Sequence, residues 1–205
     1  MILFFDQQLY VYIHIPKNSG KYIRDRIDKK NIIKSYWDVT NDLDLAHIPY
    51  MLRNNYIKND KEITYFSYSR NPYHRLISAY FYLNPQKKPC DFIDFCKNIL
   101  PKHNFDLSFR SNIIHYYPQY LFVCNDDFTV SINVTKLENL KYDDLKLKTY
   151  PLFQYYNLET LLIVERIYSK DFELFHYHKI TKGLIILFIL FILLLFYYLL
   201  IWQKK

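Results

Sequence analysis

The chain has 205 residues, enough for one domain with its own core and a short appendage. A formal charge of +7 favours an anionic partner such as a phosphorylated cofactor or an acidic glycan, although a solvated lysine surface would give the same charge. The three cysteines form no CxxC pair, which excludes zinc-finger spacing and argues against a disulfide framework.

The N-terminal part of the chain predicts a strand, a turn and a helix. Residues 1–5 are apolar but are interrupted by Asp6, a pattern that does not fit a signal peptide. Residues 9–15 read LYVYIHI, which is typical of a strand buried on both faces. A turn at residues 16–20 then leads into a predicted helix at residues 21–30.

The turn at residues 16–20 is the first candidate binding element. Gly20, one of only two glycines, lies where the strand passes into the helix. There the backbone can approach a ligand closely and the helix N-terminus offers N–H groups to an anion, while Lys17 and Lys21 add positive charge. The Walker A pattern is absent, so ordinary ATP hydrolysis has little support. By itself, a single glycine at such a turn more often has a structural role.

The rest of the body alternates predicted strands and helices. Residues 62–69 predict a strand, and Asn71-Pro72 has the chemistry of a helix start, with the helix continuing to residue 83. Further helices are predicted at residues 91–100 and 158–169, and further strands at residues 120–124 and 130–134. This alternation predicts an α/β layered fold with a mainly parallel sheet.

Residues 184–202 form an uncharged apolar run near the end of the chain. A helix of this length would be about 28 Å long, close to the hydrocarbon thickness of a bilayer. The run therefore predicts a single transmembrane helix and a membrane location, with lipid as its partner. The simplest topology is a tail anchor with the body in the cytosol. We expect one domain at residues 8–178, a linker at 179–183, the membrane helix at 184–202 and a basic tail at 203–205.

Two segments of the body resemble one enzyme family. Residues 14–23 read HIPKNSGKYI and residues 65–82 read YFSYSRNPYHRLISAYFY. Both are similar to segments of the carbohydrate sulfotransferases that use 3′-phosphoadenosine 5′-phosphosulfate (PAPS), the group containing heparan sulfate 2-O-sulfotransferase. The resemblance implies a three-layer, P-loop-like sulfotransferase fold with a mainly parallel sheet. It covers residues 10–178 in the family's order.

The resemblance also implies roles for individual residues. The first segment would wrap the 5′-phosphosulfate of PAPS through Lys17, Asn18, Ser19, Gly20, Lys21 and Tyr22. Arg70 and Ser78 match the residues that hold the 3′-phosphate, and Lys17 matches the lysine that steadies the leaving group. Ser19 replaces a family glycine, and Lys21 and Tyr22 replace a pair of hydroxyl residues.

The acceptor side is implied by two further stretches. His47, in DLAHIPYML, lies where the family has its catalytic histidine, and a histidine suits proton abstraction near neutral pH. His115 and Gln119, in HYYPQ, match a stretch that borders the acceptor cleft. No metal is expected.

The sequence therefore predicts a PAPS-dependent sulfotransferase that acts on a hydroxyl group, with a carbohydrate as the expected acceptor. A non-catalytic module that binds an adenosine phosphate or a sulfated glycan remains the main alternative. A nucleotide kinase with a divergent loop is a weaker one. Nucleic-acid binding has little support, because the basic residues form no stripe with interleaved aromatic residues.

Overall fold

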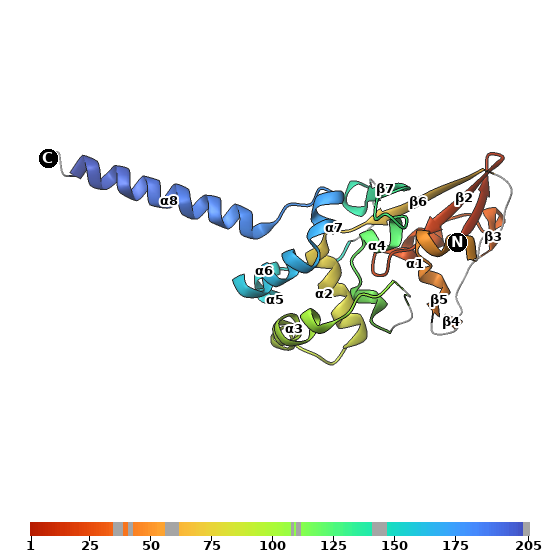
Figure 1. Ribbon diagram of the computed structural model, residues 1–205, viewed down its shortest axis with the longest axis horizontal. Coiled ribbons are helices and arrows are strands. Elements are labelled where there is room, and N and C mark those ends of the chain that lie inside the picture. The colour runs from red at the N-terminus through yellow and green to blue at the C-terminus, as the bar shows by residue number, and fades with distance from the viewer. Residues whose placement is uncertain are drawn as a thin grey trace.

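The computed structural model describes residues 1–34, 39–40, 43–55, 62–107, 109, 112–140 and 147–202. Its strands are β1 (Ile2–Phe5), β2 (Gln8–Ile13), β3 (Ile32–Lys34), β4 (Val39–Thr40), β5 (Leu43–Asp44), β6 (Ile63–Ser69) and β7 (Asn133–Lys136). Its α-helices are α1 (Gly20–Arg26), α2 (Pro72–Leu83), α3 (Pro89–Asp94), α4 (Tyr120–Val123), α5 (Leu152–Tyr155), α6 (Leu158–Ile167), α7 (Ser169–Leu174) and α8 (Ile180–Trp202). The sheet lies at one end of the body, and α2, α3, α5 and α6 gather beside it (Figure 1).

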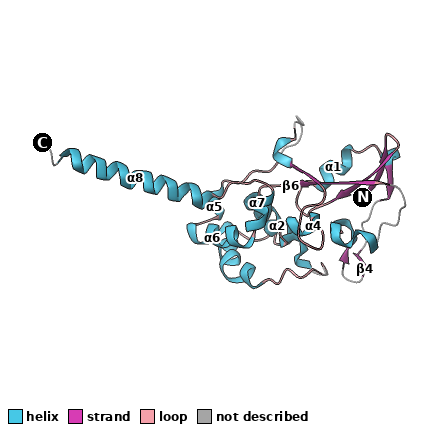
Figure 2. Cartoon of the chain, turned by 45° about the horizontal axis from the view of Figure 1, so that its top comes forward, coloured by secondary structure: helices cyan, strands magenta, loops and turns pink. Residues whose placement is uncertain are grey.

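The main sheet is mixed, which corrects the prediction of a mainly parallel sheet. In the described residues it has five strands in the order β3-β1-β2-β6-β7. The β2–β6 and β6–β7 pairs are parallel, but β1 pairs antiparallel with both β2 and β3. Figure 2 shows these strands in magenta. The sheet therefore joins a parallel half to an antiparallel half.

The antiparallel half arises from a tight hairpin at the N-terminus. Asp6 and Gln7 connect β1 to β2 with φ angles of 46° and 64°. Positive φ at both central residues is what a two-residue hairpin needs to match the twist of its strands. The apolar residues of β1 thus pair with β2, and the sheet begins before the predicted domain boundary at residue 8.

Both faces of β2 are covered, so its residues alternate between two apolar clusters. Val11 and Ile13 pack in a cluster with Phe122 of α4, on one face of the sheet. Tyr12 points the other way and packs with Ile23 of α1 and Leu137. This burial on both sides agrees with the continuous apolar run that predicted the strand.

The strand β6 and the helix α2 confirm the predictions for residues 62–83. The side chain of Asn71 accepts hydrogen bonds from the backbone N–H groups of Tyr73 and His74, and Pro72 occupies the first turn. This N-cap ends the strand at Ser69 and starts the helix two residues after Arg70. The cap thus determines where Arg70 leaves the sheet.

The predicted strand at residues 120–124 is wrong, because Tyr120–Val123 is the helical turn α4. The buried carboxylate of Asp171 accepts hydrogen bonds from the N–H groups of Gln119 and Tyr120, at 2.8 and 2.9 Å. A carboxylate that satisfies the first N–H groups of a turn stabilises helix over strand. The strand predicted at residues 130–134 instead spans Asn133–Lys136.

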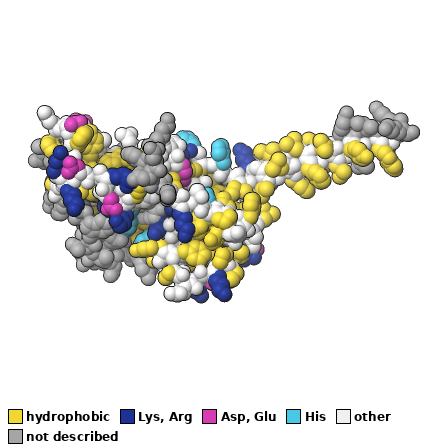
Figure 3. Space-filling view, turned by 180° about the vertical axis from the view of Figure 1, so that it is seen from behind, with side chains coloured by type: hydrophobic (Ala, Val, Ile, Leu, Met, Phe, Trp, Pro, Cys, Tyr) yellow, Lys and Arg dark blue, Asp and Glu magenta, His cyan; other side chains and the backbone are white. Residues whose placement is uncertain are grey.

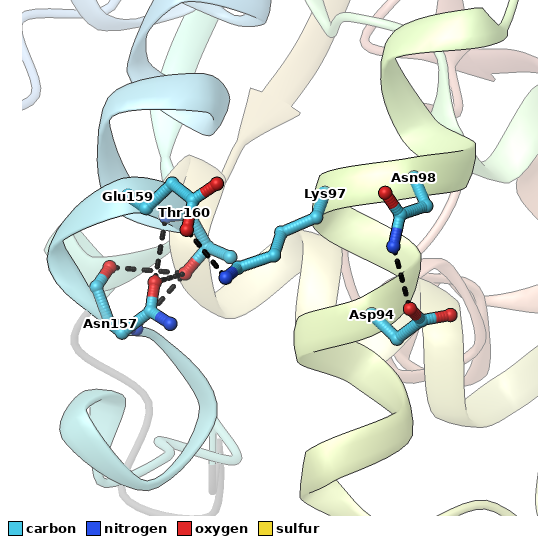
Figure 4. A network of polar contacts seen from close by, with 6 residues as sticks. All are labelled: Asp94, Lys97, Asn98, Asn157, Glu159 and Thr160. Carbon is cyan, nitrogen blue, oxygen red and sulfur yellow. Dashed lines mark hydrogen bonds and ion pairs between the residues drawn. The ribbon is translucent and has the colours of Figure 1, made fainter.

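Helix α6 confirms the helix predicted at residues 158–169, ending two residues earlier. Its N-terminus has a capping box in which Asn157 and Thr160 exchange hydrogen bonds (Figure 4). Lys97, in a π-helical turn at Phe95–Ile99, forms an ion pair of 2.5 Å with Glu159 in the first turn of α6. These contacts join α6 to the segment that follows α3.

Helix α8 extends away from the body with its apolar side chains exposed from Leu184 to Phe196 (Figure 3). Within the described part of the chain, no helix combines the length and the apolar character that crossing a membrane requires. This finding contradicts the predicted anchor at residues 184–202 and the membrane location. The predicted basic tail at residues 203–205 lies outside the described residues.

Candidate functional site

A cavity of about 540 Å³ lies at the carboxyl ends of the parallel strands β2 and β6. Five cationic residues line it: Lys17, Lys21, Arg24, Arg70 and Lys148. The other lining residues are His14, Ser19, Gly20, His47, Ser78, Tyr82 and His115. The structure thus brings the Lys17 turn, the Arg70–Ser78 pair and two of the predicted acceptor-side histidines to one cavity.

The charge of this cavity is one-sided. Among the described residues no aspartate or glutamate lines it. Lys21 forms an ion pair with Asp25 at 2.6 Å, but this pair is exposed on α1. Several cations around one concave surface raise the local concentration of anions. The cavity is therefore suited to a ligand with more than one negative group.

The turn after β2 has an unusual backbone. Lys17 and Ser19 have φ angles of 68° and 55°, in the left-handed region that residues other than glycine rarely adopt. Between them, the side chain of Asn18 is fully buried and donates to the carbonyl oxygen of Tyr68 at 2.6 Å. This buried contact offsets the backbone cost and fixes the turn against β6.

Gly20 is required by the side chain of His14. Its own φ is not positive, but a Cβ atom at Gly20 would lie closer than 3.0 Å to Nε2, Cε1 and Cδ2 of the His14 ring. The imidazole therefore packs directly against the start of α1. The sequence predicted that Gly20 lets a ligand come close to the backbone. In this structure the side chain of His14 occupies that space.

His14 and His47 form a pair of tilted rings at the side of the cavity. Their ring centroids are 4.4 Å apart. Nδ1 of His14 lies 3.2 Å from Nη1 of Arg24, and because a guanidinium can only donate, this nitrogen accepts. Burial lowers the pKa of His14 well below its usual value, and the charges of His47 and Arg24 add to the effect. His14 is therefore neutral, with its hydrogen on Nε2.

His47 is held in one tautomer by the backbone. It is 7% exposed, and its Nδ1 donates to the carbonyl oxygen of His14 at 2.8 Å. A neutral ring that donates from Nδ1 carries its lone pair on Nε2. The ring of His115 lies edge-on to His47 with centroids 5.6 Å apart. Burial lowers the pKa of His115 to about 3, with a smaller contribution from the charge of His47.

Arg70 connects two segments that border the cavity. Its side chain is almost buried, at 5% exposure, and donates to the carbonyl oxygens of Lys17 at 3.1 Å and Lys148 at 2.5 Å. Two of its five N–H groups are used in this way, and the other three have no partner among the described residues. Burial lowers the pKa of Arg70 from its ordinary value. Ser78 lines the same cavity from α2.

Lys17 projects across the cavity onto an aromatic ring. Its Nζ lies 3.8 Å from the centroid of the Tyr82 ring, a cation–π contact. Burial, together with the smaller effect of the charges of Arg70 and Arg75, lowers the pKa of Lys17 to about 8. Lys17 is thus a cation that the fold has partly desolvated, which an anion would stabilise.

Arg75 supports the cavity from below without lining it. It is buried, and its guanidinium donates to the carbonyl oxygens of Pro16 at 3.0 Å and His115 at 3.3 Å. It therefore fixes the Lys17 turn relative to the acceptor-side histidine.

Three predicted binding residues lie outside the cavity. Asn18 and Gln119 are fully buried behind it and contact each other, and Tyr22 packs with the apolar cluster under α1. Conversely, Arg24, Tyr82 and Lys148 line the cavity without having been predicted. Tyr82 could have been found from its position one turn after Ser78 on α2, whereas Lys148 arrives through tertiary packing.

The cavity has the right charge and the right neighbours for the ligand that the two sequence segments predict. Its volume lies within the roughly 300–1,000 Å³ of small-molecule sites. The resemblance to PAPS-dependent carbohydrate sulfotransferases nevertheless stays a prediction, since no family model, no curated protein and no solved structure matches the chain.

Proposed function

We propose that the chain is a PAPS-dependent sulfotransferase that acts on a hydroxyl group, with a carbohydrate as acceptor. One observation carries the proposal. The Lys17 turn and the Arg70–Ser78 pair, 53 residues apart from Lys17 to Arg70, line one cationic cavity. PAPS is anionic at both its 5′ and its 3′ position, so a ligand of this kind needs cations at two places in one site.

The residues fit the donor by charge and by hydrogen-bonding capacity. In the proposed complex, Lys17 and Lys21 would contact the 5′-phosphosulfate, and Arg70 and Ser78 the 3′-phosphate. The guanidinium of Arg70 and the hydroxyl of Ser78 can both donate directional hydrogen bonds to phosphate oxygens. Nδ1 of His115 is buried beside the cavity and has no hydrogen-bond partner among the described residues.

The proposed reaction gives roles to two side chains, His47 and Lys17. His47 accepts the acceptor's hydroxyl proton on Nε2 while its Nδ1 stays bonded to the carbonyl oxygen of His14. The acceptor oxygen forms a bond to sulfur as the bond from sulfur to the bridging oxygen breaks, and Lys17 stabilises the charge that develops on that oxygen. PAPS supplies the sulfuryl group and is released as 3′,5′-ADP. No oxidant or reductant is consumed.

The test is a transfer assay with sulfur-labelled PAPS and a panel of glycans and small hydroxyl compounds. We expect label in at least one acceptor with wild-type chain and none with Lys17→Ala or Arg70→Ala, the second mainly through weaker donor binding. Lys30→Ala serves as the control, because Lys30 is exposed and pairs with Asp28 away from the cavity. Sulfation at the wild-type rate by either site variant would refute the assignment.

Two other outcomes separate the rival functions. Calorimetric binding of 3′,5′-ADP without transfer to any acceptor would indicate a binding module. Turnover of ATP that depends on Mg²⁺ would indicate a kinase whose phosphate-binding loop differs from the Walker A pattern.

A further inference from the structure

A buried carboxamide connects the two halves of the cavity from behind. Gln119 is fully buried, and its Oε1 accepts from the backbone N–H of Arg70 at 2.9 Å. Its Nε2 donates to the backbone carbonyl of Arg70 at 2.8 Å. The side chain of Gln119 thus pairs with both polar groups of the Arg70 backbone, as a neighbouring strand would.

The same carboxamide also contacts the Lys17 turn. Oε1 of Gln119 accepts a second hydrogen bond, from Nδ2 of Asn18, at 2.8 Å. Asn18 is fully buried and also donates to the carbonyl oxygen of Tyr68. One oxygen atom therefore receives a donor from each half of the site, 49 residues away at Arg70 and 101 residues away at Asn18.

The backbone of Gln119 is itself fixed. Its N–H donates to Oδ2 of Asp171 at 2.8 Å, and the next N–H, of Tyr120, donates to Oδ1 at 2.9 Å. Asp171 is fully buried in α7. Both the backbone and the side chain of Gln119 are therefore held, and its amide orientation is set by the two donors that meet Oε1.

We propose that Gln119 is a positioning residue that sets the separation between the Lys17 and Arg70 halves of the cavity, and so selects a ligand with two phosphate groups. The inference rests on the proposed function. Gln119 does not line the cavity, so it acts through Asn18 and Arg70. A bisphosphate must contact both halves of the cavity at once, whereas a monophosphate can bind in one half. A change in the separation of the halves therefore weakens binding of the bisphosphate more than binding of the monophosphate.

The readout is the ratio of two dissociation constants, that of 5′-AMP over that of 3′,5′-ADP, measured by calorimetry. For wild-type chain we expect a preference of about a hundredfold for the bisphosphate, because the 3′-phosphate adds charge-assisted hydrogen bonds. Gln119→Met keeps the length of the side chain but removes its polar contacts, and should lower the ratio by about tenfold or more. Asn18→Ala, which removes the other donor to Oε1, should lower it in the same direction and serves if Gln119→Met does not fold.

A control distinguishes positioning from loss of stability. Tyr156→Phe removes a buried hydrogen bond to the carbonyl oxygen of Tyr73, away from the cavity, and should lower the melting temperature without changing the ratio. If both site variants keep the wild-type ratio, the positioning role is refuted and the proposed function stands. If wild-type chain binds neither nucleotide, or shows no preference for the bisphosphate, both the proposed function and the positioning role of Gln119 are refuted.

Discussion

His47 donates a hydrogen bond from Nδ1 to the backbone carbonyl of His14, and the centroids of the two tilted imidazole rings lie 4.4 Å apart. His14 directly follows the last residue of β2. The position of the proposed base is therefore set by the end of a central strand. The tautomer that places the lone pair on Nε2 follows from the fact that a carbonyl can only accept.

Replacing His47 by Ala should lower the sulfation rate by about a hundredfold or more, the contribution typical of a general base. The dissociation constant of 3′,5′-ADP should change little, because the main donor-binding contacts are assigned to the Lys17 turn, Arg70 and Ser78. Single-turnover transfer and calorimetry on the same preparation measure the two effects. His178→Ala, at an exposed position outside the cavity, is the matched control. Equal losses in rate and in 3′,5′-ADP affinity would mean that His47 binds the donor and does not act as the base.

Local chemistry explains what the sequence predicted well. The end of β6 and the start of α2 are determined by Asn71 and Pro72, which act within a few residues of their own position. Arg70 directly follows β6, and Lys17 lies in the turn that follows β2. The two strands are parallel neighbours, so both side chains lie at the same edge of the sheet. The convergence of these two residues on one cavity was therefore predictable.

The remaining features depend on contacts that are distant in sequence. Asp6-Gln7 lacks the glycine that usually marks a two-residue hairpin, so the antiparallel strand β1 gave no turn signal. Gln119 was predicted to face the acceptor, but Asp171, 52 residues later, fixes its backbone and turns its side chain toward Arg70. A polar residue at a site can contact the ligand itself, or it can position another residue that contacts the ligand. The sequence pattern is the same in both cases.

The pKa of Lys17, lowered to about 8, makes anion binding dependent on pH in the alkaline range. Anion binding needs the protonated amine, and a bound anion raises its pKa, so binding takes up protons. The dissociation constant of 3′,5′-ADP should therefore rise from pH 7 to pH 9, by up to about tenfold for each pH unit above 8. In Lys17→Arg the guanidinium stays charged, and the constant should be nearly flat over this range. The same alkaline rise in Lys17→Arg would assign the titration to another group.

Gly20→Ala and Gly183→Ala form a matched pair, because both glycines lie in helices but only one meets a side chain. A Cβ atom at position 20 would overlap the His14 ring, whereas one at position 183 has nothing within 4 Å. Gly20→Ala should displace His14, weaken 3′,5′-ADP binding and lower the melting temperature. Gly183→Ala should leave binding unchanged and stabilise α8 by roughly 0.5–1 kcal/mol through helix propensity. Equal 3′,5′-ADP affinities by calorimetry and equal melting temperatures for the two variants would show that the His14 ring does not require a glycine at position 20.

Glu165 holds the first turn of α8 on the body, and its removal tests how firmly that helix is attached. Its carboxylate is buried and accepts hydrogen bonds from the hydroxyls of Tyr73 and Thr181 and, at 3.0 Å, from the backbone N–H of Thr181. The Tyr73 hydroxyl in turn accepts from the N–H of Ile180 at 3.0 Å. Glu165→Ala leaves these donors without an acceptor and should lower the free energy of unfolding by roughly 2–4 kcal/mol.

The loss should be accompanied by faster hydrogen exchange at the Ile180 and Thr181 amides, which would then open without unfolding of the body. Glu159→Ala is the control, because Glu159 lies on the same helix but pairs with Lys97 at the surface (Figure 4). Exposed ion pairs contribute about 0–1 kcal/mol, so this variant should unfold at nearly the wild-type urea midpoint. Unchanged exchange at both amides in Glu165→Ala would show that packing of α8 on α6, and not the carboxylate, attaches the helix to the body.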